Sequence, residues 1–246
     1  MNPMADRLYL SLWYPNFRLE ALPAALAGVL RQFTLIGAKR VSAASAYPID
    51  FTEPPTYQRI YVDTSQDTPV GHPPQIDPTP GASDAAIEAA VAEATEQLHD
   101  DMAYEFEMRW QLWALEPPPS AYGSIDSDLD DEAEIDIDPE AHDTPWKLRP
   151  HVVRILGFGP EFDVAGYEQN GHLLVDFGLD TPWVLETNQD EPLDDEAQLH
   201  IQQNIEKLLA FTLLVEKNCG ISSRLLWTES GEPLAEKLIA RLQRVN

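Results

Sequence analysis

The sequence predicts one α+β domain over residues 1–246, in which an antiparallel or mixed sheet packs against about four helices. Two observations lead to this prediction. Segments with strand-like alternation and segments with helical apolar spacing follow one another in mixed, unrepeated order, whereas a doubly wound parallel sheet would alternate them regularly. The chain has 246 residues and 43% hydrophobic content, so it can bury a sizeable core.

The first 62 residues predict the order β-α-β-β. Leu8, Leu10 and Leu12 alternate with Tyr9 and Ser11 as in a strand. The following helix tolerates Pro23 only in its first turn, and strands are expected over 41–49 and 57–62. The expected buried face of the helix consists of Leu22, Leu26, Val29, Leu30 and Phe33.

The last hundred residues predict further strands and two helices. Strands are expected over 152–158, 162–167, 172–177, 183–185 and 221–228, with Asn170-Gly171 forming the tight turn of a hairpin. Asp194 or Asp195 caps a helix that Gly220 terminates. Its expected inward residues are Leu199, Ile205, Leu208, Leu209, Thr212 and Leu213. A terminal helix buries Leu234, Leu238, Leu242 and Val245.

The negative charge of the chain is regional. The formal net charge is −26, and residues 60–146 hold more than half of all Asp and Glu residues but a single Lys or Arg, Arg109. This region resembles an insertion in an ordinary globular protein. We expect it to contain a proline-rich connector over 64–82, a long acidic helix over 83–116 and a mobile acidic loop over 120–146.

One candidate site is a metal centre on the long helix. Glu96 and His99 are three residues apart, the spacing that lets one helix face offer a carboxylate and an imidazole to a metal, and Asp100 adds an oxygen. Such a centre needs a matching pair from another helix, and Glu196 with His200 has the wrong spacing for that motif. An exposed histidine among carboxylates is the simpler explanation.

The acidic loop suggests a second, looser way of binding cations. Asp126, Asp128 and Asp130 occupy the first ligand positions of a calcium-binding loop. Asp131 replaces the glycine that this loop requires, and Ile137 replaces its bidentate glutamate. No defined calcium site and no cofactor are therefore predicted; weak binding of a divalent cation by the carboxylates is the alternative to a solvated loop.

The aromatic residues near the end of the expected long helix suggest a surface for a partner. Tyr104, Trp110 and Trp113 occupy more than one helix face, which would leave aromatic surface available to another protein. The simpler explanation is that both faces pack within this protein. With the loop carboxylates Asp128, Asp130 and Asp131, these rings form the candidate partner-binding set.

Composition excludes several classes of function. The net charge repels nucleic-acid phosphates and anionic membrane surfaces, and the apolar runs are too short to span a bilayer. The N-terminus lacks signal-peptide features, and the single cysteine, Cys219, excludes an internal disulfide. These features predict a cytoplasmic location.

Two functional hypotheses remain open. The first is a non-enzymatic binding or regulatory protein whose acidic layer engages a basic protein, as an immunity protein or a mimic of nucleic-acid charge would. Here the acidity could equally serve only solubility. The second is a metal-assisted enzyme that uses Glu96, His99 and Asp100, with His172 or His200 brought close by folding.

Overall fold

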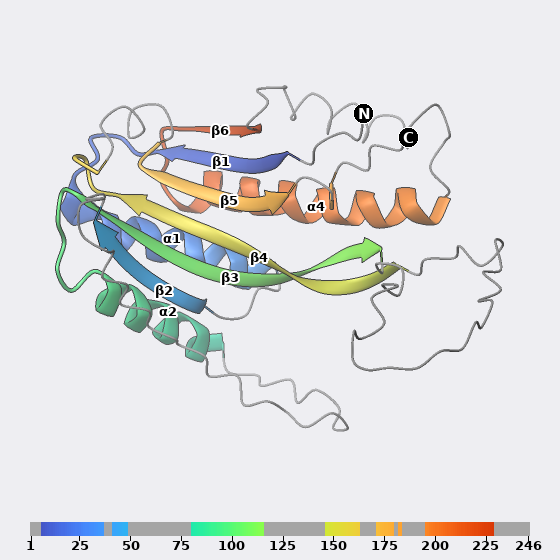
Figure 1. Ribbon diagram of the computed structural model, residues 1–246, viewed down its shortest axis with the longest axis horizontal. Helices are drawn as coiled ribbons and strands as arrows, with labels where there is room; N and C mark the ends of the chain where they lie inside the picture. The colour runs from blue at the N-terminus through green and yellow to red at the C-terminus, as the bar shows by residue number, and fades with distance from the viewer. Residues whose placement is uncertain are drawn as a thin grey trace, which may run out of the picture.

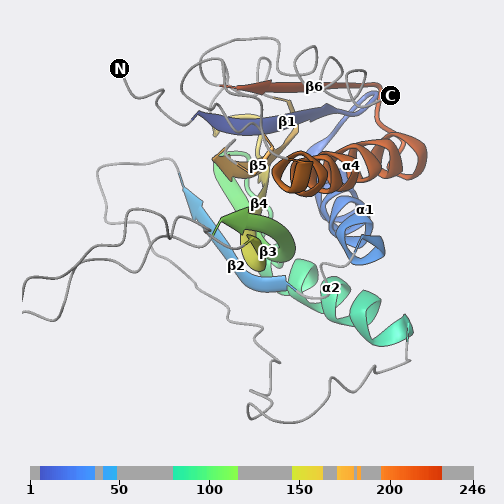
Figure 2. The ribbon, with the colours of Figure 1, turned by 90° about the vertical axis from the view of Figure 1, so that its right-hand side faces the viewer.

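The strands form one six-stranded, fully antiparallel sheet, and the helices pack on one of its faces (Figures 1 and 2). The computed structural model describes residues 6–36, 41–48, 80–115, 146–162, 171–179, 182–183 and 195–228. None of the helices within these ranges is long and apolar enough to cross a membrane. The predicted α+β class is confirmed, with an antiparallel sheet.

The sheet order places the first strand next to the last described one: β2-β3-β4-β5-β1-β6. The strands are β1 (Arg7–Trp13), β2 (Val41–Pro48), β3 (Met102–Leu115), β4 (Trp146–Phe158), β5 (Leu173–Leu179) and β6 (Ser223–Thr228). The helices are the short 3-10 helix η1 (Leu19–Ala21), α1 (Leu22–Leu35), α2 (Pro80–Ala94) and α4 (Asp195–Asn218).

Strand β1 follows its predicted alternation. Leu8, Leu10 and Leu12 are fully buried, because successive side chains of a strand point to opposite faces and this face meets the helices. On the other face, the Tyr9 ring stacks on Trp227 of β6 with ring centroids 4.6 Å apart. The pairing of β1 with both β5 and β6 joins the two ends of the chain within one sheet.

Helix α1 also agrees with the prediction. Pro23 lies in its first turn, where no amide hydrogen bond is lost. The predicted face is buried throughout, from Leu22 to Phe33. Helix α1 approaches β4 closely at Gly157, where an added Cβ would lie 2.6 Å from Leu22 Cδ1. A larger residue at this position would therefore force the ends of Leu22, Leu26 or Leu173 to move.

Helix α4 begins at Asp195 and is followed by Gly220 with φ +63°, as predicted. Its inward face is partly different from the expected one. Leu199 and Leu213 are 52% and 58% exposed, whereas Phe211 and Val215 are fully buried. The prediction placed the helix in a slightly wrong rotation, because it included the buried Thr212 but not the buried polar residues His200 and Asn204.

The predicted long helix over 83–116 is wrong. Helix α2 ends at Ala94, and β3 begins at Met102 and pairs with β4 from Ala103 to Leu115. Buried side chains in β3 occur at every second position from Tyr104 to Leu112, which is the period of a strand. Residues 80–82, predicted to belong to the proline-rich connector, lie in the first turn of α2 instead.

The predicted hairpin is only partly described. The strand expected over 172–177 is β5, and Gly171 has φ +90°; the partners of β5 are β4 and β1. Strands expected over 41–49, 152–158 and 221–228 are confirmed by β2, β4 and β6. Several other predicted segments lie mostly or wholly outside the described residues: 57–62, 64–82, 120–146, 162–167, 183–185 and the terminal helix.

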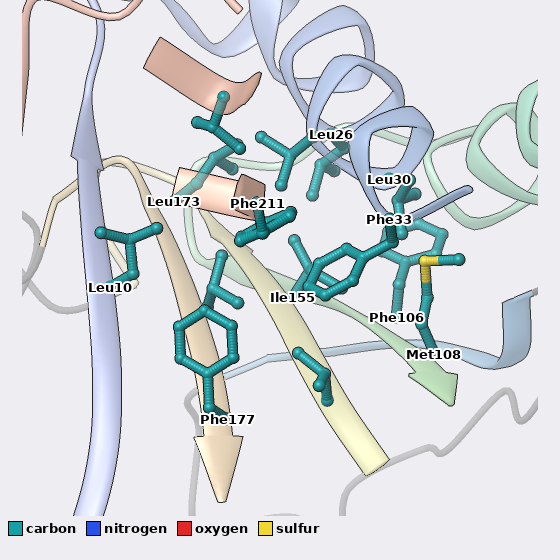
Figure 3. Packing of buried hydrophobic residues seen from close by; sticks show 14 of the residues in the cluster. Leu10, Leu26, Leu30, Phe33, Phe106, Met108, Ile155, Leu173, Phe177 and Phe211 are labelled. Carbon is teal, nitrogen blue, oxygen red and sulfur yellow. The ribbon is translucent and has the colours of Figure 1, made fainter. Parts of the chain in front are cut away.

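The core lies between the sheet and the helices (Figure 3). Aromatic rings from four elements meet there: Phe33 of α1, Trp110 of β3, Phe177 of β5 and Phe211 of α4. The rings of Phe33 and Phe211 stack with centroids 3.9 Å apart, and Trp110 meets Phe33 edge-on at 5.5 Å. This contact network fixes the positions of α1 and α4 relative to β3.

Candidate functional site

Glu96, His99 and Asp100 lie in the connection between α2 and β3, not on a helix. All three residues are exposed. The helical spacing on which the predicted metal centre depended is therefore wrong. Within the described part of the chain, no group of three or more His, Cys, Asp or Glu side chains could hold a metal ion.

Hydrogen bonds hold the α2–β3 connection against the sheet. The buried Tyr104 hydroxyl accepts the His99 amide N–H at 2.9 Å and donates to the Gln97 carbonyl at 3.0 Å. Gly159 passes so close that an added Cβ would lie 2.3 Å from the Asp100 carbonyl oxygen. The connection is thus fixed through main-chain groups, while its acidic side chains remain exposed.

The predicted partner-binding aromatic residues occupy different environments. Tyr104 is fully buried and Trp110 is 1% exposed, so both rings pack within this protein and neither offers surface to a partner. Burial raises the pKa of the Tyr104 hydroxyl. Trp113 keeps part of its surface exposed. Asp128, Asp130 and Asp131 lie outside the described residues.

Trp113 belongs to a cluster with Trp146 and His200, which we name the Trp–His–Trp cluster. The His200 ring lies 3.9 Å from the Trp113 ring and 5.3 Å from the Trp146 ring, between centroids. His200 is 9% exposed, and its Nδ1 atom is buried without a hydrogen-bond partner. Its Nε2 atom lies 3.5 Å from the Glu196 carboxylate, whose side chain is 69% exposed.

Asn204 positions β3 beside this cluster. Strand β2 pairs with β3 only as far as Met108, so the next part of this edge meets α4 instead. The fully buried Asn204 side chain accepts the Trp113 amide N–H at 2.9 Å and donates to the Trp113 carbonyl at 2.8 Å. It also donates to the Pro182 carbonyl at 2.8 Å. One side chain thereby replaces a neighbouring strand.

Sequence reasoning missed Trp146 and Asn204, and it considered His200 only as a possible metal ligand. The spacing of Glu196 and His200 on one helix face was visible, but no sequence pattern indicated that the two tryptophans lie beside them. The contact joins β3, β4 and α4, which are far apart in the chain. If β3 had been predicted as a strand, part of this contact could have been inferred from the sequence.

The outer face of the sheet carries paired charges. Arg7 forms an ion pair with Asp176, which also accepts the Gly178 amide N–H at 2.8 Å. Arg154 lies 3.4 Å from Glu105 and 3.3 Å from Glu107. Basic groups on neighbouring strands therefore balance the carboxylates of this face. Other carboxylates of the described residues are exposed on α2, on the connection after it and on α4.

At one end of β1, burial determines the chemistry of the single cysteine. Burial raises the pKa of the Cys219 thiol to about 11 and also raises the pKa of the nearby Tyr14 hydroxyl. The His172 ring stacks on Phe17 at 4.4 Å, and its Nδ1 atom accepts the Tyr14 amide N–H. A thiol of this kind is a poor nucleophile at neutral pH, because the thiolate is the reactive form.

His151 provides a prediction about acid stability. Burial lowers its pKa from 6.5, although its hydrogen bond to the Phe177 carbonyl and nearby Asp176 act in the opposite direction. Below pH 6.5 the unfolded chain therefore binds more protons at this site than the folded chain does. The stability that this lowered pKa of His151 contributes is fully present above pH 6.5. It is lost as the pH falls toward the pKa of His151 in the folded state. We expect His151→Gln to lose less unfolding free energy than wild type between about pH 7 and about pH 5.

Urea unfolding at several pH values measures this difference. His172 is shifted in the same direction by burial, so wild type and the His151 variant should both retain part of the acid sensitivity. Parallel stability profiles for the two proteins would show that His151 does not contribute.

Comparison with known proteins gives no family for this chain. No protein-family model, curated protein or solved structure was found to match it. The functional conclusions therefore depend on the residues described above.

Proposed function

We propose that this chain is a non-enzymatic binding or regulatory protein whose acidic surface engages a basic surface of another protein. The observation that carries the proposal is the uneven distribution of charge. No Lys or Arg occurs between Arg59 and Arg109, although the net charge of the chain is −26. An excess of one sign over one region attracts a surface of opposite sign and excludes partners of like charge.

The described part of this region supports the proposal through exposure. Asp84, Glu88 and Glu93 on α2 are exposed, as are Asp100 and Asp101 in the following connection. Arg31 pairs with Glu88 across the α1–α2 contact. Exposed carboxylates of this kind remain hydrated until a partner arrives, so they favour encounter with a cationic surface at little cost to folding.

The alternative, a metal-assisted enzyme, is no longer supported by the helical spacing that suggested it. Glu96, His99 and Asp100 do not share a helix face, and the described residues contain no other suitable group of metal ligands. Among the described residues, no contact favours a catalytic reaction over binding.

Capture experiments at low and high salt test the proposed function. Immobilised full-length protein should retain a basic protein from native lysate, and the purified pair should lose affinity steadily as salt screens the opposite charges. A partner whose affinity does not depend on salt, or the absence of any basic partner at low salt, would contradict the proposal.

Replacing carboxylates on α2 tests where this attraction acts. The double variant Asp84→Asn/Glu93→Gln should weaken the purified complex by a few-fold, mainly through slower association. The matched control, Glu206→Gln/Glu216→Gln, removes the same charge from exposed positions on α4. Equal effects of the two double variants would show that only net charge matters.

A further inference from the structure

We propose that the Trp–His–Trp cluster and Glu196 together form an anchor for an arginine side chain of the basic partner. This inference rests on the proposed function and adds the position and chemistry of one contact. A guanidinium group can lie on an indole face and donate hydrogen bonds to a carboxylate at the same time. The Trp–His–Trp cluster and Glu196 provide an indole face and a carboxylate side by side.

The geometry presents the two indoles on the same face of the β3–β4 ladder. Trp113 is paired with Leu148, and Trp146 with Leu115. Trp113 and Trp146 are therefore diagonal neighbours on one face of the two strands. Both keep part of their surface exposed, and Leu148 is 48% exposed. Lys147 follows Trp146, and strand alternation directs it to the opposite face, so no lysine of β4 occupies this face beside the indoles.

His200 supports the rings from the side of α4. Its own ring is almost completely buried between the tryptophans, so it holds their positions and is not itself the surface that a partner meets. Its Nδ1 atom has no hydrogen bond. If the cluster served packing alone, an apolar side chain at this position would be more stable, because an unpaired buried polar atom costs free energy.

Glu196 gives the anchor its charge. It lies one helical turn before His200, and its carboxylate approaches the imidazole at 3.5 Å while its side chain stays 69% exposed. The contact with His200 places the carboxylate beside the ring that packs between the two indoles, and the exposed part remains available to a guanidinium group. Arginine is favoured over lysine, since its planar fork matches both the ring face and the carboxylate.

Binding of a synthetic peptide of eight arginines to the full-length protein tests the anchor. Glu196→Gln should weaken binding about fivefold, and the matched control Glu206→Gln, on the same helix with the same loss of charge, should weaken it less than about twofold. Glu206 is exposed and accepts a hydrogen bond from Gln202, so neither substitution threatens the fold. Equal effects of the two variants would overturn the anchor.

The indole N–H resonances of the protein give a second, direct measurement. On addition of the peptide, those of Trp113 and Trp146 should shift most, and those of the buried Trp110 and Trp183 should remain almost unchanged. A peptide of eight lysines should bind more weakly and move the two signals less. Shifts confined to Trp13 or Trp227 would overturn the anchor but leave the proposed function standing. Failure of wild type to bind either peptide at low salt would contradict the proposed function itself.

Discussion

Trp110→Ala is expected to lower the free energy of unfolding by about 3–5 kcal/mol. Trp110 is 1% exposed and contacts Phe33, Phe177 and Trp183, with ring centroids 5.5, 5.8 and 6.1 Å away. Removal of the indole leaves a cavity between β3 and the helices. Those rings belong to several elements and cannot all move inward to fill it, so the lost contacts are not replaced. Urea unfolding should show a lower midpoint with an unchanged slope.

Trp110→Phe is the matched control for this substitution. The Trp110 Nε1 atom is buried without a hydrogen-bond partner, so phenylalanine removes an unsatisfied donor while it keeps most of the apolar surface. We expect a loss of no more than about 2 kcal/mol. A loss below about 1 kcal/mol for the alanine variant would contradict the core position of Trp110.

The error over residues 95–116 has a simple physical origin. Met102, Phe106 and Trp110 are four residues apart, which places them on one face of a helix, but every fourth residue also lies on one face of a strand. The deciding residues are those between them. Tyr104 and Met108 are apolar as well, and Glu105 and Glu107 alternate with them. This period of two was present in the sequence and was outweighed by the helical spacing.

Local sequence patterns predicted a helix or strand correctly where residues within that one element determine its structure. The alternation in β1, the first-turn proline of α1 and the glycine after α4 each act within a few residues. The candidate site could not be predicted in this way, because it depends on contacts between distant segments. An asparagine or a histidine within α4 gives no local sign that it is buried against the edge of a strand.

Asn204→Leu is expected to lower the free energy of unfolding by about 2–4 kcal/mol. Leucine has a similar size but cannot replace the three hydrogen bonds that Asn204 forms with the main-chain groups of Trp113 and Pro182. One amide N–H and two carbonyl groups would lose this partner in a buried place, and each unsatisfied group costs about 1–3 kcal/mol. The total stays below the sum, because water can enter at the edge of β3 once α4 loosens.

Two measurements distinguish this role of Asn204 from general packing in α4. Hydrogen exchange should become faster at the Trp113 amide in Asn204→Leu than at amides in the centre of β1, since the edge of β3 is released first. The control, Gln202→Leu, alters a half-buried side chain of the same helix that donates a hydrogen bond to the exposed Glu206, and should change stability by about 0.5 kcal/mol or less. Similar losses for both variants, with Trp113 still protected, would show that β3 does not depend on Asn204 for its free edge.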